Sequence, residues 1–169
     1  KIDSCLRGNL GAEIDSLLLE TSATASFIAP ALPELGRTTV NDVHMVGGIP
    51  VAETEIGRDP LCPVSESRLS RLLSGQSRMK VGHVNRHCLD NGSDATLQRV
   101  QSLLAEGCRH LAFDAFCSDH LDAIVALERT HFNNEIVLAG SAGLAHRAHA
   151  AHVAGHGGGG GHPREGHRR

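Results

Sequence analysis

Apolar residues follow two different spacings near the start of the chain, and each spacing predicts a different element. Between residues 9 and 21 they recur every three or four positions after Asn9, whose side chain can cap a helix, so we expect a helix there. At residues 25–31 the run ASFIAPA is almost entirely apolar and is interrupted by proline, which indicates a short buried strand.

The period of the pattern changes after residue 36. Residues 37–55, RTTVNDVHMVGGIPVAETE, alternate between apolar and polar side chains, and Gly47 and Gly48 separate two arms rich in β-forming residues. Two glycines between such arms are typical of a β-hairpin turn. We therefore expect a hairpin in this stretch, followed by a loop at RDPLCP.

The remaining pattern alternates short apolar strands with amphipathic helices. The predicted helices cover 65–75, 93–107 and 118–131, and the predicted strands cover 80–85, 109–116 and the start of 135–145, where a glycine-rich turn leads into a last helix. Such alternation requires parallel strands joined by crossover helices. The predicted fold class is α/β: a mostly parallel sheet covered by helices, with an inserted β-hairpin.

The composition changes near His146. Residues 146–169 are rich in His, Gly and Arg and contain few large apolar side chains, so they cannot build a core. We therefore predict one α/β domain over 1–145 and a disordered, low-complexity tail over 146–169.

Composition excludes several classes of partner. Hydrophobic residues make up 40% of the chain, but aromatic residues only 2%, too few for a protein that stacks nucleic-acid bases. The net charge is −3, and no apolar run reaches the ~18 residues of a membrane span, so we expect neither nucleic acid nor membrane as a partner. The five cysteines are scattered and lack a C-x-x-C pair, which favours reduced thiols in a cytoplasmic protein.

The stretch DSCLRGN, before the first predicted helix, is the first candidate site. Arg7 can bind a carboxylate or phosphate in bidentate fashion, Asp3 can accept hydrogen bonds from a polyol, and Gly8 lets a ligand approach the backbone. The helix that begins near Asn9 would turn its N–H groups towards an anion. The alternative is a capped helix start with an exposed Asp3–Arg7 ion pair.

Three further stretches leave a functional and a structural interpretation open. Arg37 follows a glycine at the mouth of a strand, so it can bind an anion or simply lie in a solvent-facing turn. Glu53 belongs to a set of acidic loop residues that suit acid–base or metal chemistry, or are merely solvated. The turn AGSAGLA can cradle a phosphate, but it lacks the full G-x-G-x-x-G and equally suits close helix–strand packing.

Histidines supply no predicted metal centre. His83, His87 and Cys88 would suit a metal if the stretch HVNRHC were helical, but its pattern indicates a strand and a loop. The histidines of the tail lie among many glycines, which does not suit a designed metal site. We therefore assign no metal ligand.

Three segments together resemble a known family. KIDSCLRGNLGAEID, then APALPELGRTTVNDVHMVGGIPVAETEIGRDP, then VLAGSAGLA resemble, in order and spacing, the sugar-binding N-terminal domain of the four-carbon acid sugar kinases, which act on D-threonate, D-erythronate or 3-oxo-tetronate. The resemblance covers residues 1–145. It implies an α/β domain that binds the acid sugar, a separate C-terminal domain that binds ATP, and transfer of the γ-phosphoryl group to the terminal hydroxyl of the sugar acid.

The resemblance also implies a set of substrate-binding residues. The family segment K-x-D-S-T-L-R-G-N lines the substrate site, and Arg37 and Glu53 stand in further family-like motifs. In this role Lys1 or Arg7 would neutralise the substrate carboxylate, while Asp3 and Ser4 would bind its hydroxyls. The predicted substrate-binding residues are Lys1, Asp3, Ser4, Arg7, Asn9, Arg37 and Glu53; no catalytic residue is assigned.

The chain departs from the family pattern in three ways. Cys5 replaces the usual Thr, the acidic motif D-D-x-T-G-A is absent, and the ATP-binding domain is absent. We therefore expect an inactive fragment whose partners are a small four-carbon sugar acid and the missing nucleotide-binding domain. ATP and Mg²⁺ would serve the parent enzyme and would not bind this fragment. A stand-alone sugar-acid-binding or regulatory module, or a non-functional truncated product, remains the alternative.

Overall fold

Strands and helices alternate along most of the chain in the computed structural model, which describes residues 1–133 and 135–156. The strands of the main sheet are β1 (Ala25–Ala29), β5 (Val81–Val84), β6 (His110–Phe113) and β7 (Ile136–Gly140), and those of a small sheet are β2 (Arg37–Val40), β3 (Val43–Val46) and β4 (Ile49–Pro50). The α-helices are α1 (Leu10–Glu20), α2 (Leu69–Gln76), α3 (Arg86–Asp90), α4 (Ser93–Ala105), α5 (Ser118–His131) and α6 (Ala142–His156).

The main sheet is parallel and has the order β5-β6-β1-β7. Every residue of β1 and of β6 is buried, as expected for strands that are covered on both faces. This arrangement confirms the predicted α/β fold with a parallel, helix-covered sheet.

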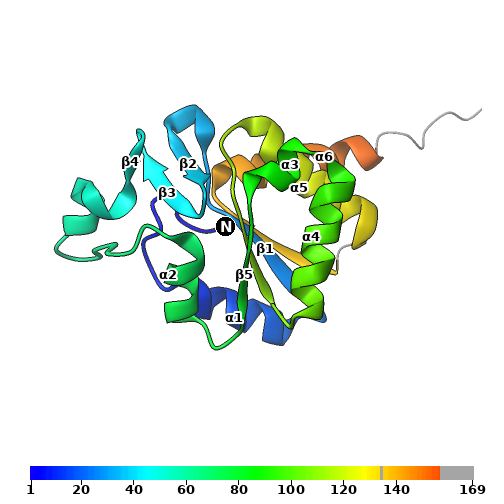
Figure 1. The fold of residues 1–169 in the computed structure, drawn as a ribbon, viewed down its shortest axis with the longest axis horizontal. Helices are drawn as coiled ribbons and strands as arrows, with labels where there is room; N and C mark the ends of the chain where they lie inside the picture. Colours follow the sequence, from blue (N-terminus) through cyan, green and yellow to red (C-terminus); the bar gives the residue numbers. More distant parts are fainter. Residues whose placement is uncertain (134, 157–169) are drawn as a thin grey trace, which may run out of the picture.

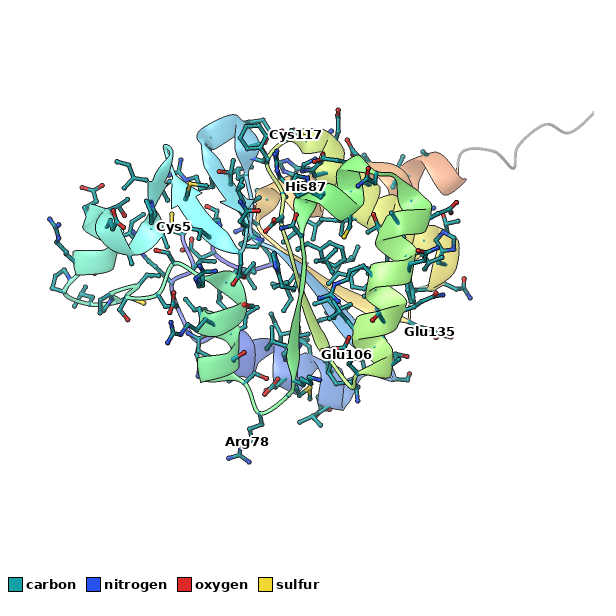
Figure 2. All side chains as sticks on the ribbon, in the orientation of Figure 1. Cys5, Arg78, His87, Glu106, Cys117 and Glu135 are labelled. Carbon is teal, nitrogen blue, oxygen red and sulfur yellow. The ribbon has the colours of Figure 1, made fainter. Side chains whose placement is uncertain are left out.

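Two apolar clusters lie on opposite faces of this sheet because successive strand residues point to opposite sides. Phe27 packs with α4, α5 and α6 in one cluster, and its ring lies 4.9 Å from that of Phe113 and 5.4 Å from that of Phe132. Ile28 packs with α1 and α2 in the other. Side chains fill the space between these layers, whereas Arg78, in the loop before β5, points away from the molecule (Figure 2).

The small sheet is an antiparallel meander, β2-β3-β4, that lies beside the main sheet (Figure 1). The predicted turn at Gly47 and Gly48 joins β3 to β4, with φ of 60° and 81°. A second tight turn, which the sequence pattern did not reveal, joins β2 to β3 at Asn41 and Asp42, with φ of 50° and 72°. Asn and Asp tolerate this left-handed conformation better than other residues with a Cβ, so no glycine is needed there.

The end of the described chain differs from the sequence-based expectation. Residues 146–156 continue helix α6, where a disordered tail was predicted from His146. Ala148 and Ala151 pack against the core, and Arg147 lies 3.2 Å from Glu34 and 3.3 Å from Asp122. Alanine-rich sequence with such anchors favours a helix. Residues 157–169 of the predicted tail lie outside the described residues.

Three other observations complete the description of the fold. The stretch after β5, predicted as a loop, forms the short helix α3, in which the Asn85 side chain accepts a hydrogen bond from the backbone N–H of His87 (2.9 Å). Among the described residues, no helix is long and apolar enough to cross a membrane. All five cysteines are free thiols.

Candidate functional site

The carboxyl ends of the parallel strands meet two other segments, residues 1–9 and the β2-β3-β4 meander. The backbone N–H of Ile2 donates to the carbonyl of Gly140 at the end of β7 (2.9 Å). Thr39 of β2 exchanges two backbone hydrogen bonds with Ala115, just after β6 (2.9 and 3.0 Å). In open α/β sheets ligands bind at this edge, so these segments frame the candidate site.

The segment around Asp3 is organised by its own carboxylate. Oδ2 of Asp3 accepts hydrogen bonds from the backbone N–H groups of Cys5 (3.1 Å) and Arg7 (3.2 Å). The backbone between them turns through positive φ at Leu6 (64°), and Gly8 follows with φ of 94°. Asp3 therefore shapes the loop through one oxygen, while the other carboxylate oxygen is available to a ligand hydroxyl, since the side chain is 39% exposed.

Arg7 lies between two carboxylates. Its Nη1 atom is 3.8 Å from Asp3, and its Nε atom is 3.7 Å from Asp59. Backbone N–H groups of the following loop hold the pKa of Asp59 below its usual value, and the Arg7 charge contributes to the shift. The Asp3–Arg7 ion pair considered as the structural alternative is thus present. One guanidinium facing two carboxylates attracts a further anion weakly.

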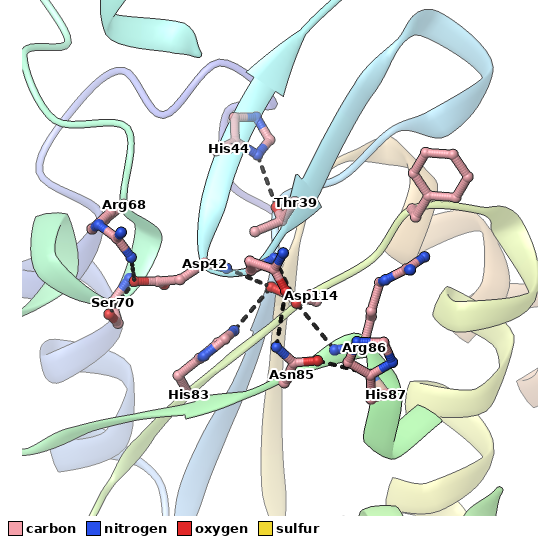
Figure 3. A network of polar contacts seen from close by, with 12 residues as sticks. Thr39, Asp42, His44, Arg68, Ser70, His83, Asn85, Arg86, His87 and Asp114 are labelled. Carbon is pink, nitrogen blue, oxygen red and sulfur yellow. Dashed lines mark hydrogen bonds and ion pairs between the residues drawn. The ribbon is translucent and has the colours of Figure 1, made fainter. Parts of the chain in front are cut away.

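His44 links this segment to the meander. The ring is buried in β3, and its Nε2 atom lies 2.8 Å from the carbonyl oxygen of Ser4. Its Nδ1 atom lies 2.9 Å from the hydroxyl of Thr39, as Figure 3 shows. Burial lowers the pKa of His44, and the positive charge of Arg37 lowers it further, although Ser4 and Asp3 oppose the shift. His44 is therefore neutral at pH 7.

Unlike Arg7, Arg37 has no carboxylate partner among the described residues. It pairs with Val46 across the meander, two positions along from the Thr39–His44 pair, so Arg37 and His44 share one face. Its Nη1 atom donates to the carbonyl oxygen of Leu35, and its buried Nε atom has no hydrogen-bond partner within the described part of the chain. No carboxylate among residues 1–133 and 135–156 lies within ion-pair distance of it. An unneutralised guanidinium suits an incoming anion.

The structure thus brings together only part of the predicted set. Asp3, Ser4 and Arg37 gather around His44, and Arg7 joins them through Asp3. Lys1, Asn9 and Glu53 are exposed, and within the described residues their side chains make no hydrogen bond or ion pair with this group. Asn9 occupies the N-cap position of α1, as predicted, but its side chain makes no capping hydrogen bond.

Asp114 is a buried polar residue that the sequence reasoning did not single out. Its carboxylate accepts hydrogen bonds from the backbone N–H groups of Asn41 (2.9 Å), Asp42 (2.9 Å) and Arg86 (3.0 Å), and from Nε2 of His83 (2.9 Å) (Figure 3). Burial alone would raise the pKa of Asp114, but these hydrogen bonds outweigh it and hold the pKa below its usual value. The carboxylate therefore fastens the meander turn to the main sheet.

Asp42 continues the same network towards α2. Its carboxylate accepts from the backbone N–H (2.8 Å) and the hydroxyl (2.7 Å) of Ser70, and Arg68 lies 3.9 Å away. The sequence signal for this network was an acidic residue directly after the apolar strand RHLAF, a position that faces the carboxyl edge of a sheet.

The glycine-rich turn after β7 serves close packing. A Cβ atom on Gly140 would lie 2.5 Å from Cβ of Leu144 and 2.7 Å from the carbonyl oxygen of Ala29, and one on Gly143 would lie 2.7 Å from that of Ala31. These glycines let α6 approach β1, which supports the packing alternative. Across the described residues, no three His, Cys, Asp or Glu side chains form a potential metal site.

A cavity of about 280 Å³ lies next to the candidate site. It is lined by Leu6 and Gly8, by the loop 62–66 and by α2, and its charged residues are Glu66 and Arg71, whose side chains lie 3.4 Å apart. None of the charged residues in the predicted set lines it. Arg71 is thus a cation near the candidate site but outside the predicted set, and a substitution of Arg71 can serve as a control for one of Arg37.

Comparisons with known proteins agree with these observations. A family model described as a sugar-binding N-terminal domain matches residues 1–148. The chain is 34% identical over 122 residues to a 3-oxo-tetronate kinase of Brucella melitensis (72% of this chain, 28% of that protein). It is 33% identical over 144 residues to a D-threonate kinase of Salmonella typhimurium (85% of this chain, 33% of that protein). It spans about 28% of the length of the first curated relatives that it matches.

Solved structures share the fold. A Haemophilus influenzae protein of the DUF1537 family superposes with a TM-score of 0.82 at 28% identity, covering 98% of this chain and 40% of that one. A DUF1537 domain from Bordetella bronchiseptica, crystallised with bound citrate, superposes with a TM-score of 0.72 at 30% identity and covers 92% of this chain and 36% of that one.

Proposed function

Since this chain belongs to the family of sugar-binding N-terminal domains, we propose that it is the part of a four-carbon acid sugar kinase that binds the sugar acid. The whole enzyme would transfer the γ-phosphoryl group of ATP to the terminal hydroxyl of a threonate- or erythronate-type acid. The chain spans about 28% of the first curated relatives, so phosphoryl transfer is assigned to the whole protein. The chain alone is expected to bind without turnover.

The observation that carries this proposal is the arrangement of Asp3, Ser4 and Arg37 around His44. A four-carbon sugar acid presents one carboxylate and several hydroxyls. Arg37 offers a guanidinium without a carboxylate partner, and Asp3 offers a free carboxylate oxygen within the same group. The site therefore supplies a cation for the acid end and an acceptor for the hydroxyls.

The structure changes the roles proposed for the two arginines. Arg7, which the family motif suggested for the carboxylate, is already shared between Asp3 and Asp59. Arg37 has no such competitor, so we propose Arg37 as the carboxylate ligand and Arg7 as a residue that holds the loop in place. Lys1, Asn9 and Glu53 remain predicted contacts only, because this group does not reach them.

ATP and Mg²⁺ are proposed for the parent enzyme and not for this chain. The glycines of the turn between β7 and α6 support close packing of that helix, and the turn lacks the full G-x-G-x-x-G of a nucleotide site. The nucleotide would therefore be held by another domain of the parent, which we propose as the partner of this one. The cytoplasmic location and the exclusion of nucleic acid and membrane stay predictions.

Calorimetric titration of the chain with D-threonate and D-erythronate tests the proposal. We expect saturable binding of at least one acid, no binding of the uncharged polyol threitol, and no effect of ATP. Arg37→Gln should weaken acid binding by about 2 kcal/mol, roughly 30-fold, because it removes a charge-assisted hydrogen bond. Arg71→Gln is the matched control, since Arg71 lines the neighbouring cavity. The affinity of this variant for the acid should equal that of the original chain.

Two outcomes would contradict the proposal. One is a chain with a cooperative unfolding transition that binds neither acid. The other is an equal loss of affinity in Arg37→Gln and Arg71→Gln, which would mean that general positive charge, and not the Arg37 position, attracts the acid.

A further inference from the structure

We propose that His44 is a positioning residue, which holds the Ser4 segment in the conformation that receives the sugar acid; this inference rests on the proposed function. His44 belongs to β3, forty residues from Ser4 in sequence, and its buried ring lies between the Ser4 carbonyl and the Thr39 hydroxyl. The ring contacts the binding segment through a backbone atom, so it orders the segment and leaves the Ser4 hydroxyl to the ligand.

The partners of the ring define its hydrogen-bonding roles. The carbonyl oxygen of Ser4 can only accept, so Nε2 of His44 carries the proton and donates it over 2.8 Å. In the neutral ring Nδ1 then accepts from the hydroxyl of Thr39 over 2.9 Å. Burial and the charge of Arg37 both favour this neutral form. The hydrogen bonds at both ring nitrogens fix the tautomer, so the Nε2–H group of His44 points towards the Ser4 carbonyl.

These contacts connect the binding segment to the rigid sheet. Thr39 exchanges backbone hydrogen bonds with Ala115 at the end of β6, and His44 donates its own N–H to the carbonyl of Ser67 (2.7 Å). His44 and its partner Thr39 are thus bonded to segments other than the one that contains Ser4. Fixing the Ser4 carbonyl sets the orientation of the Ser4–Cys5 peptide, whose N–H group donates to Asp3.

Apart from the local bonds to Asp3, hydrogen bonds to other parts of the chain hold the ends of the segment. Ile2 is bonded to Gly140, and the carbonyl of Gly8 accepts from the side-chain amide of Gln76 (3.0 Å). Within the described residues, the bond from His44 is the only hydrogen bond that Ser4 makes. Losing it should leave the chain folded but free the centre of the segment, where the ligand would bind.

Four variants test this role. His44→Leu removes the donor, whereas His44→Gln keeps an amide N–H near the place of Nε2. Thr39→Val keeps the ring but removes the hydroxyl that orients it. Ser26→Ala is the matched control, because it breaks another buried serine–histidine bond (Ser26 Oγ to His110 Nδ1, 2.8 Å) at the opposite end of the sheet.

Two measurements are compared at a temperature where every variant is folded. The first is the Kd for D-threonate and D-erythronate, which we expect to rise about tenfold in His44→Leu and Thr39→Val, but to stay within about threefold of the original in His44→Gln and Ser26→Ala. The second is amide hydrogen exchange at Cys5 in the absence of ligand, which should accelerate in the same two variants only. If His44→Leu does not fold, a comparison of Thr39→Val with His44→Gln still distinguishes the positioning role from a purely structural one.

A purely structural role predicts a different pattern. In that case His44→Leu and Ser26→Ala would both lower the Tm while leaving the Kd of the folded protein unchanged, and the positioning role would be refuted. If the original chain binds neither acid, the proposed function fails, and the exchange rates alone decide: unchanged Cys5 exchange in Thr39→Val would overturn the positioning role, and accelerated exchange would support it.

Discussion

Replacing Asp114 with asparagine should destabilise the fold by about 3 kcal/mol. Oδ1 of Asp114 accepts from Asp42 and His83, and Oδ2 accepts from Asn41 and Arg86. An asparagine amide has one oxygen and one NH₂ group, so in either orientation two of the four donors face another donor. Two hydrogen bonds to a charged acceptor contribute about 3–6 kcal/mol, and relief from burying the charge offsets part of that sum.

This destabilisation can be measured by thermal unfolding followed by circular dichroism. For a chain of this size 1 kcal/mol corresponds to about 2–4 °C, so the Tm of Asp114→Asn should fall by about 6–12 °C. Asp119→Asn is the matched control, because Asp119 is exposed in the first turn of α5 and should contribute less than about 1 kcal/mol. A Tm within about 2 °C of that control would refute the hydrogen-bond argument.

The pH dependence gives a second test of the same residue. The folded-state pKa of Asp114 lies below the usual value of 3.8, so its stabilising contribution is complete above that value and is lost as the pH falls through the lower folded pKa. The Tm difference between the original chain and Asp114→Asn should therefore be constant between about pH 7 and 5 and narrow below about pH 4. A difference that widens on acidification would contradict the assigned charge state.

Two further substitutions test the packing of α6. Gly140→Ala should cost about 1–3 kcal/mol, because its Cβ would lie 2.5 Å from Cβ of Leu144, whereas Gly75→Ala, with no atom within 4 Å, should be neutral or slightly stabilising in a urea titration. Ala148→Asp should cost about 1–3 kcal/mol, because it places a charge against the core, and the same change at exposed Ala154 should cost under about 0.5 kcal/mol; equal costs would show that residues 146–156 do not pack as described.

The sequence was sufficient to predict elements that have a regular spacing of apolar and polar side chains. The alternation of apolar strands with amphipathic helices predicted the parallel sheet and the helices α1, α2, α4 and α5. It was insufficient where structure depends on backbone conformation or on distant contacts. The turn at Asn41 and Asp42 contains no glycine, so its left-handed backbone was not visible in the pattern. Residues 146–156 looked too simple to fold, but Arg147 and two alanines anchor them to the rest of the domain.

The candidate site shows the same division. The motif around Asp3 could be recognised, since its residues are adjacent in sequence. His44 could not, because its role arises only when β2 and β3 pair in the register that sets it opposite Thr39 and when the ring meets a carbonyl forty residues away. The structure was also needed to prefer Arg37 over Arg7 as the proposed carboxylate ligand. Asp59 lies close to Arg7, and the sequence pattern did not predict where the loop that contains Asp59 would lie.

One series of contacts connects the proposed binding segment to the core of the fold. Asp114 holds the turn between β2 and β3, that turn fixes the pairing of Thr39 with His44, and His44 holds the carbonyl of Ser4. A residue buried at the end of β6 therefore governs the order of a loop that it does not touch. Since local openings occur at the least stable contacts, the Ser4 segment should become disordered before the sheet unfolds, and bound sugar acid should suppress that opening first.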